Sequence, residues 1–486
     1  MKLFSFSFFF VFISINLVAQ KPSSYCGTSV ETQAFMIEQS RKTSKVITDS
    51  RAPIFIPMQV HSVGSDAGGG HFRLHYIYDA LCNLNKDYAP SGIQFFLEND
   101  INYINSSSWN THEYDAGEEM MRKNNKANVA NSYIVADPAG NCGYFSPRGN
   151  AVALAKSCIG DGDHTWAHEM GHFFSLPHTF FGWEGIRYDQ SKTINEWQRQ
   201  VFTTIEQKQR ANCNNQADGY CDTPPDYLSY RWECDRSNNS IVQHKDVNDS
   251  TFYADGSLFM SYSNDHCSSR FAEDQMEGMR QNIAGSRSNL IRNNVIPVYI
   301  SNLNYNNILP VDSGNIKGKN VTLTWDPIPG ASRYIIDIAR NTSFGLYPQQ
   351  FITSDNFVKI DSLNAGTRYF WKVRAVNNYD FCGAKTKTLT FKTETITATN
   401  NFESSTLNVY PNPIQQNELL MISYERNSDI KKISISNLNN QSIIEQEITD
   451  SNSEFTKLDV KKLLPGIYKL NIHSSTSLIS KKIIVQ

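Results

Sequence analysis

The chain has 486 residues, of which 40% are hydrophobic and 12% aromatic, so it can bury a sizeable core and is long enough for about three domains. Its formal net charge is −3, which favours no particular class of partner. There is no basic stripe that would predict binding to nucleic acid and no acidic block that would predict a solvating tail. Composition therefore excludes a nucleic-acid-binding protein.

The N-terminus reads as a targeting segment. Lys2 precedes a run of Phe, Val, Ile and Leu that ends in the small Ala19. This pattern predicts a secretory signal peptide at residues 1–19, with an uncleaved membrane anchor as the alternative. The run is short for an anchor, and no other segment could span a bilayer, so no membrane span is expected after signal removal. An exported chain can form disulfides, and nine cysteines leave at least one without an internal partner.

Residues 20–50 are polar and lack helix or strand periodicity, which predicts a short propeptide. They contain Cys26. A thiolate is a good zinc ligand, so a cysteine in a removable segment could occupy the open position of a metal site and keep an enzyme latent. The alternative is that Cys26 pairs with Cys82 or with nothing.

From Arg51 the pattern becomes mixed helix and strand. Strands are expected at Ile54–His61, around Phe95, at Ser132–Asp137 and at Ala151–Ala155, with one helix between the first two. This predicts a twisted sheet with a backing helix and an active-site helix beneath it. Cys142 and Cys158 flank the last of these strands and are candidates for a disulfide.

The segment from His168 to His178 carries the predicted chemistry. If residues 165–174 are helical, His168 and His172 lie one turn apart on one face, where two imidazoles can bind one ion. Glu169 lies about 100° round the helix, too far to bind the same ion but close enough to take a proton from a metal-bound water. After a turn, His178 can complete a three-histidine zinc site with one position left for water. The alternative is an ordinary histidine pair on a solvated helix face.

Two acidic and aromatic segments follow. Residues 181–210 are an insertion that predicts a loop and an amphipathic helix at the mouth of the cleft. In the next segment, Asp218, Asp222 and Asp226 offer oxygen ligands beside a glycine turn, so calcium is a candidate ligand. The alternative is a disulfide-tied loop in which the aspartates cap turns.

Met260 and Tyr262 form a second candidate segment. Methionine usually fills gaps in a core, so the pair has little meaning alone. It gains weight because it follows a three-histidine motif in the same predicted domain. The Tyr262 hydroxyl could then hydrogen-bond the oxyanion that forms during attack on a carbonyl.

The run HEMGHFFSLPHTF resembles the metzincin metalloproteases, whose motif HExxHxxGxxH is followed by a methionine-bearing turn. Ser175 stands where that motif has glycine. A serine that keeps the left-handed conformation there should cost roughly 1–2 kcal/mol. The substitution removes no ligand.

With the segments CDTPPD and FMSYSNDHCSSRFAEDQ, residues Pro53–Ser286 are similar to the pappalysin family of metzincins. The resemblance implies these roles: zinc ligands His168, His172 and His178; catalytic glutamate Glu169; Met-turn residues Met260 and Tyr262.

The same resemblance implies two disulfides in this region and calcium near the cleft. By chain order, Cys213 would pair with Cys234 and Cys221 with Cys267.

Two smaller β domains are expected downstream. Val321, Leu323 and Trp325 alternate as a strand, and the segment around Tyr369 resembles the tyrosine corner of a fibronectin type III domain. This domain is predicted at residues 296–395, with a role in binding substrate or in spacing the enzyme, and a linker follows at 396–405.

Residues 406–486 alternate as a small β-sandwich. They begin with Tyr410, Pro411, Asn412 and Pro413, contain a Gly-x-Tyr turn and end in basic and β-branched residues. These features resemble the C-terminal sorting domain of the type IX secretion system, which implies that this secretion machinery is a partner. The alternative is a second adhesive β-module.

The predicted fold class is multidomain: an α+β metzincin-like catalytic domain at residues 51–295, with a twisted sheet and a zinc helix, followed by two all-β sandwich domains. The predicted function is a zinc metalloendopeptidase acting on proteins or peptides, secreted from or attached to the outer surface of a Gram-negative bacterium. Competing interpretations are a surface-displayed non-catalytic adhesin stabilised by zinc and a metal-dependent hydrolase of a non-peptide substrate. A structural zinc site needs no base, so Glu169 favours the enzyme.

Overall fold

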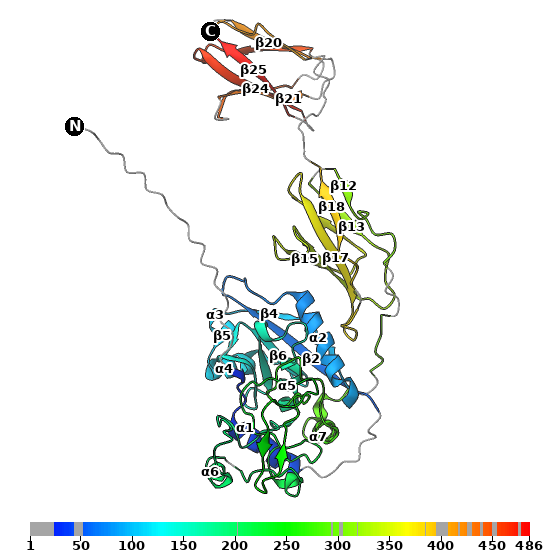
Figure 1. Cartoon of the computed structure of the whole chain (residues 1–486). Helices are drawn as coiled ribbons and strands as arrows, with labels where there is room; N and C mark the ends of the chain where they lie inside the picture. The colour runs from blue at the N-terminus through cyan, green and yellow to red at the C-terminus, as the bar shows by residue number, and fades with distance from the viewer. Residues whose placement is uncertain are drawn as a thin grey trace, which may run out of the picture. The chain divides into compact units, whose positions relative to one another are not determined.

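The computed structural model describes residues 24–42, 52–201, 203–292, 295–300, 305–317, 319–383, 385–394, 407–416, 418–424, 430–437, 441–449, 454–474 and 478–486. The predicted signal peptide and the linker at 396–405 lie outside these ranges. The chain forms two compact units, one ending at Thr393 and the other beginning at Glu394 (Figure 1). In the described part of the chain, no helix has the length and apolar character needed to cross a membrane.

A twisted, mostly parallel sheet forms the centre of the first unit. Its strand order is β1-β8-β9-β6-β2-β3, with β4 also paired to β2. Only β8 runs antiparallel to its neighbour β9. The strands are β1 (Ser24–Cys26), β2 (Ile54–Gly64), β3 (Ile93–Leu97), β4 (Asn102–Asn105), β6 (Ala130–Val135), β8 (Asn141–Ser146) and β9 (Ala151–Ala155).

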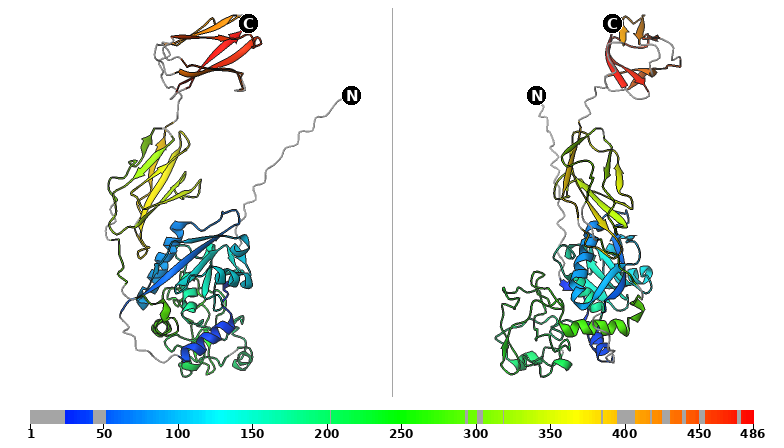
Figure 2. Two further views of the ribbon diagram at one scale, coloured as in Figure 1. Left: turned by 180° about the vertical axis from the view of Figure 1, so that it is seen from behind. Right: turned by 90° about the vertical axis from the view of Figure 1, so that its right-hand side faces the viewer.

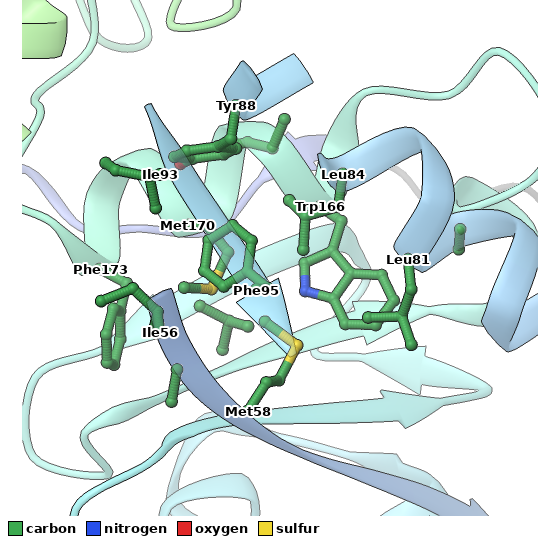
Figure 3. Close-up of a cluster of buried hydrophobic side chains, with 14 of the residues drawn as sticks. Ile56, Met58, Leu81, Leu84, Tyr88, Ile93, Phe95, Trp166, Met170 and Phe173 are labelled. Atoms are coloured by element: carbon green, nitrogen blue, oxygen red, sulfur yellow. The ribbon is translucent and has the colours of Figure 1, made fainter. Parts of the chain in front are cut away.

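Helices α2 (Leu74–Tyr88) and α5 (Thr165–Phe173) pack on one face of this sheet. Figure 3 shows Met58 of β2 and Phe95 of β3 beside Trp166 of α5 and Leu81 of α2. The period of two along each strand sends alternate side chains to the other face, where helix α4 (Tyr114–Asn124) covers Tyr133 of β6. Helix α5 is thus held against the sheet by its apolar side, which leaves the histidine side facing away from this core.

The prosegment has more regular structure than its sequence predicts. Residues 24–26 form β1 and residues Val30–Lys42 form helix α1. Strand β1 is only three residues long and is stabilised by the edge of β8, while Met36 and Ile37 of α1 are buried by other parts of the unit. Because these contacts are tertiary, no periodic pattern in the segment could reveal them.

The segment between α5 and helix α7 (Glu273–Ala284) forms a lobe with few regular elements, drawn in green in Figure 2. It contains α6 (Ile194–Gln198) and the short pair β10 (His244–Lys245) and β11 (Thr251–Phe252). Its core is aromatic, with Trp183 stacked on Tyr227 at 4.4 Å between ring centroids and Trp197 fully buried. The insertion therefore contributes Trp183 and Trp197 to this core, and α6 lies where the sequence predicts a helix.

The disulfide pairing in this lobe corrects the prediction. Cys213 pairs with Cys221, and Cys234 pairs with Cys267. Positive φ at Ala217 and Gly219 turns the first loop back on itself, so its two ends meet. These backbone turns, and not chain order, decide which sulfurs meet.

The other two disulfides lie elsewhere in the first unit. Cys142 pairs with Cys158 as predicted, with a Cα–Cα distance of 5.4 Å. Cys82 pairs with Cys382, 300 residues away, which was not predicted. This bond excludes the alternative in which Cys26 pairs with Cys82.

A fibronectin-like β-sandwich completes the first unit. One sheet has the order β12-β18-β17-β14-β15 and the other pairs β13 with β16. Trp325 is buried, and the Tyr369 hydroxyl accepts a hydrogen bond from the backbone N of Asn364 at 2.9 Å. The strands are β12 (Gly314–Ile316), β13 (Val321–Thr324), β14 (Arg333–Ala339), β15 (Gln349–Thr353), β16 (Phe357–Ile360), β17 (Arg368–Val376) and β18 (Leu389–Thr393).

This sandwich is joined to α2 by more than the Cys82–Cys382 bond. The Arg374 guanidinium lies 2.6 Å from the Asp79 carboxylate, and His75 lies 3.1 Å from Asp337. These contacts explain why it belongs to the same compact unit as the sheet and α5.

The second unit is a smaller β-sandwich. Its sheets have the orders β19-β20-β23 and β22-β21-β24-β25, and Leu420, Ile433 and Leu470 are buried between them. The strands are β19 (Asn408–Tyr410), β20 (Leu419–Ser423), β21 (Ile430–Ser436), β22 (Ser442–Glu447), β23 (Phe455–Asp459), β24 (Gly466–Ser474) and β25 (Leu478–Val485). The predicted architecture, a mixed helix and sheet region followed by two β-sandwiches, is confirmed.

Candidate metal centre

The end of helix α5 sets the geometry of the site. Ser175 has a φ of 73°, in the left-handed region that the sequence predicts for this position. The backbone N of Leu176 bonds to the carbonyl of Gly171 at 2.9 Å and closes the turn. The side-chain amide of Asn282 donates to Ser175 Oγ at 2.7 Å, a contact that offsets part of the cost of a serine in this conformation. The turn carries the chain back to His178.

Three imidazoles meet below this turn. His168 Nε2 lies 3.2 Å from His178 Nε2, and His172 Nε2 lies 3.1 Å from the same atom. Two nitrogen ligands of a tetrahedral zinc ion, each about 2.0–2.1 Å from the metal, lie about 3.3 Å apart. The spacing of the three nitrogens therefore fits a shared zinc ion.

The opposite ring nitrogens fix the tautomers. His168 Nδ1 lies 2.7 Å from the carbonyl of Phe259, and His172 Nδ1 lies 2.7 Å from the carbonyl of Leu176. A carbonyl only accepts, so each Nδ1 carries the proton and each Nε2 presents a lone pair to the centre. Burial lowers the pKa of all three rings, that of His178 to about 3, which keeps them in the neutral form that binds metals.

Glu169 is buried beside this cluster. Its Oε1 has no hydrogen-bond partner among the described residues, and its Oε2 accepts from the hydroxyl of Thr28 at 3.4 Å. Burial raises the pKa of Glu169 to about 8, and a cation nearby would favour the carboxylate. A Cβ at Gly143 of β8 would lie 2.7 Å from Glu169 Cγ, so this glycine leaves the space that the carboxylate occupies.

Met260 and Tyr262 contact different parts of the site. Met260 is fully buried below α5, and its carbonyl accepts from the backbone N of Thr179 at 3.2 Å, next to His178. The ring centroid of Tyr262 lies 4.8 Å from that of His178, and its hydroxyl donates to the Cys26 carbonyl at 3.2 Å. Met260 thus supports the turn, while Tyr262 faces the prosegment.

Gly171 allows Met260 to pack this close, and we expect Gly171→Ala to destabilise the protein. A Cβ at Gly171 would lie 2.5 Å from Met260 Sδ. Overpacking costs about 1–3 kcal/mol, whereas loss of a helical glycine returns at most about 1 kcal/mol. Thermal unfolding of the secreted chain would measure the change. Gly69→Ala is the matched control, since its nearest neighbour would lie 3.7 Å away, and equal melting temperatures would contradict this packing.

The prosegment covers the centre. Cys26 Sγ lies 3.5 Å from His172 Nε2, and it forms one group with the three histidine nitrogens within 4.8 Å of one another. A sulfur and a nitrogen bound to one tetrahedral zinc ion lie about 3.6 Å apart, from Zn–S of about 2.3 Å. The sulfur therefore stands where a fourth ligand would be.

Strand β1 also occupies the edge of the central sheet. Ser24 pairs with Asn141 and Cys26 with Gly143 of β8, in parallel. Gln33 of α1 accepts a hydrogen bond from the backbone N of His178 at 3.0 Å. A cleft of about 990 Å³ continues from this strand along the metal centre.

The three aspartates predicted for calcium differ in their surroundings. Asp226 Oδ2 accepts from the hydroxyls of Thr179 and Ser261 at 2.8 and 2.7 Å, so it ties the loop after His178 to the turn after Met260. This agrees with the alternative in which the aspartates hold loops.

A second acidic group lies near Asp218 in the same lobe. Asp218 Oδ1 accepts from the backbone N of Tyr220 at 3.0 Å, and Asp222 Oδ1 has no partner among the described residues. Glu206, which the sequence did not point to, is buried with neither carboxylate oxygen bonded to a described residue. Burial, and then the charge of Asp218, raise the pKa of Glu206 to about 9. Glu206 and Asp218 are thus close enough for their charges to interact, and the charge of Arg210 acts in the opposite sense.

Sequence reasoning missed Gln33, Glu206 and Arg231, all of which contact the site or its lobe. None of them lies in a motif. Each acquires its position from contacts between distant segments, and only Glu206 lies in the insertion that the sequence singled out.

Comparisons with known proteins find similar proteins for two parts of the chain. Residues 408–486 match the family model described as the secretion system C-terminal sorting domain. The chain is 29% identical over 224 residues to extracellular metalloprotease 1 of Coccidioides posadasii, covering 43% of this chain and 75% of that protein. It is 27% identical over 199 residues to an extracellular metalloprotease of Pyricularia oryzae, covering 35% of this chain and 69% of that protein.

Among solved structures, a promirolysin mutant of Tannerella forsythia is similar with a TM-score of 0.39 and 18% identity, over 55% of this chain and 97% of that chain. The chain is therefore related to extracellular metalloproteases through its sequence matches, and it carries a secretion-system sorting domain. The protein is exported, either secreted or attached to the cell surface, as predicted.

Proposed function

We propose that this protein is a secreted zinc endopeptidase of the pappalysin type, made in a latent form, which hydrolyses peptide bonds of extracellular proteins. The observation that carries this proposal is the group of three imidazole nitrogens at zinc-ligand spacing beside Glu169, whose Oε1 bonds to no residue in the part of the chain that the structure describes. The relationship to extracellular metalloproteases supports it.

The side chains have separate tasks in this reaction. Zinc held by the three imidazoles would supply Lewis acidity, which activates a water molecule and polarises a peptide carbonyl. Glu169 takes a proton from the water through Oε1 and passes it to the leaving amine. The Tyr262 hydroxyl, once the Cys26 carbonyl has gone, donates to the oxyanion instead.

The prosegment accounts for latency. Cys26 would be a fourth ligand of the metal, and β1 pairs with the edge of β8 that an extended substrate would otherwise pair with. Removal of residues 20–50 opens both together. A substrate that pairs with the edge of β8 is recognised through its backbone, so peptides of many sequences can bind there. Pockets for side chains along the cleft then supply selectivity.

The C-terminal unit gives the protein its route of export. We propose that residues 406–486 are read by the type IX secretion machinery and that the fibronectin-like module is a fixed extension of the protease, because Cys82–Cys382 and the Arg374–Asp79 pair join it to α2.

Incubation of the processed, secreted protein with casein tests the function. We expect hydrolysis that a zinc chelator stops and that added zinc restores. A protein that binds one zinc ion and unfolds more easily without it, yet releases no peptides, would be a zinc-stabilised adhesin and would overturn the proposal.

We also propose a calcium site that includes Glu206 and Asp218, with Asp222 close by. A buried carboxylate without a donor is costly, and a hard cation with oxygen ligands relieves that cost. We expect calcium at 100 times its Kd to stabilise the protein by about 2.7 kcal/mol, seen as a higher melting temperature.

The Glu206→Gln variant should lose this gain, because the amide carries no charge. Half-buried Glu277→Gln on α7 is the control. Equal calcium effects in Glu206→Gln and in the unchanged protein would contradict this site.

A further inference from the structure

Tyr25, the residue before Cys26, fills a pocket beside the metal centre. Its side chain is buried, and its ring packs edge-on against His168 at 5.1 Å and against Tyr262 at 5.4 Å between centroids. Tyr25 and Tyr262 line the cleft that runs past the metal centre. The prosegment thus places one aromatic side chain directly next to the atoms that would react.

Arg231 forms the wall of this pocket. The centre of its guanidinium lies 4.0 Å from the centroid of the Tyr25 ring. The guanidinium is held in place by the Asp265 carboxylate at 2.6 Å and by the carbonyl of Ser263. A planar cation fixed by two acceptors loses little freedom when an aromatic ring stacks on it, so it favours such a ring.

The end of the pocket is polar, but the charges beside Tyr25 do not favour a lysine or arginine side chain of a substrate. Thr165, the first residue of α5, hydrogen-bonds the Tyr25 hydroxyl. Asp163, Glu184 and Asp265 line the cleft, and the Asp265 carboxylate beside the Tyr25 ring is paired with Arg231. An arginine or lysine side chain entering here would meet the Arg231 cation, whereas tyrosine or phenylalanine meets a flat cationic face.

We propose that Tyr25 occupies the pocket for a substrate side chain that adjoins the scissile bond, and that Arg231 makes this pocket selective for aromatic side chains. The inference rests on the proposed peptidase function and adds the class of residue that the enzyme prefers. Removal of the prosegment vacates the pocket and leaves Arg231, Thr165 and Tyr262 in its walls.

Peptides released from a denatured proteome by the processed enzyme test this selectivity. At one of the two positions that flank the cleaved bond, we expect enrichment of Tyr and Phe. Arg231→Leu should reduce that enrichment about fivefold, the effect of losing one cation–π contact, and should raise cleavage beside Lys and Arg because Asp265 loses its partner. Arg340→Leu is the matched control, since Arg340 stacks on Tyr347 at 4.2 Å in the fibronectin-like module.

Binding provides a readout without catalysis. Peptides spanning residues 23–29, with tyrosine or with the changes Tyr25→Phe and Tyr25→Arg, are titrated against the secreted chain after limited proteolysis has removed its prosegment. We expect the first two to bind about fivefold more tightly than the third, and Arg231→Leu to remove the difference.

Equal binding of the three peptides, or the same cleavage profile in Arg231→Leu and the unchanged enzyme, would overturn the inference. Absence of chelator-sensitive hydrolysis would overturn the proposed function instead, and the binding order would still decide the selectivity of the pocket.

Discussion

Glu169→Gln is expected to abolish hydrolysis while zinc stays bound. The amide keeps the size of the carboxylate but cannot take a proton from water, and general-base catalysis contributes about 10²–10⁴-fold to a rate. The three imidazoles are untouched, and their Nδ1 bonds to the carbonyls of Phe259 and Leu176 do not involve Glu169. Rates of casein hydrolysis and the zinc content of the purified variant are the two measurements.

Glu119→Gln is the matched control for this variant. Glu119 is exposed on α4 and pairs with Lys123 at 2.6 Å, so its loss should leave both rate and zinc content unchanged. Full hydrolysis by Glu169→Gln would remove Glu169 from the reaction. Loss of zinc together with activity would show instead that the glutamate supports the metal site.

Cys26→Ser is expected to make the uncleaved chain active. Serine is a poor zinc ligand at neutral pH, because its hydroxyl is not ionised, so the fourth position opens to water. Mutation of a residue that only hydrogen-bonds a metal ligand typically changes metal affinity or activity by 10–100-fold. Loss of the sulfur, which is closer to the metal, should therefore raise the activity of the intact chain by about 100-fold. Mass spectrometry must show that residues 20–50 are still attached when the rate is measured.

The control for this prediction keeps the sulfur and removes another contact of the prosegment. Thr32→Ala affects only a side-chain bond to Ser29 on the exposed side of α1 and should stay latent. If the intact Cys26→Ser chain is as inactive as the unchanged zymogen, pairing of β1 with β8 suffices for latency and the sulfur is dispensable.

Part of the site follows from local geometry. His168 and His172 are one helical turn apart, so the helix alone brings them to one face, and Glu169 must then lie to the side. The left-handed turn at Ser175 was expected from its place in the motif and is present with a φ of 73°. Its partner Asn282, 107 residues away, was not expected, because a contact so distant along the chain leaves no local pattern.

Contacts between distant residues explain the errors as well. Chain order suggested Cys213–Cys234 and Cys221–Cys267, but the 213–221 loop closes on itself and Trp232 pairs with Ser263, which brings Cys234 to Cys267. The strand of the prosegment is too short, and its helical pattern too weak, to be recognised from the sequence alone. The edge of β8 provides the hydrogen-bond partners that hold β1 as a strand.

Local patterns in the sequence were enough to predict the spacing of the histidines along α5, the strands β2, β3, β6 and β9, and the C-terminal sorting domain. Only contacts in the folded chain decided the Cys213–Cys221 and Cys234–Cys267 pairs, the pairing of β1 with the edge of β8, and the stacking of Tyr25 on Arg231. The reason is physical. Local periodicity depends on a few neighbouring residues, whereas these contacts depend on burial and hydrogen bonding between segments that meet only in the folded chain.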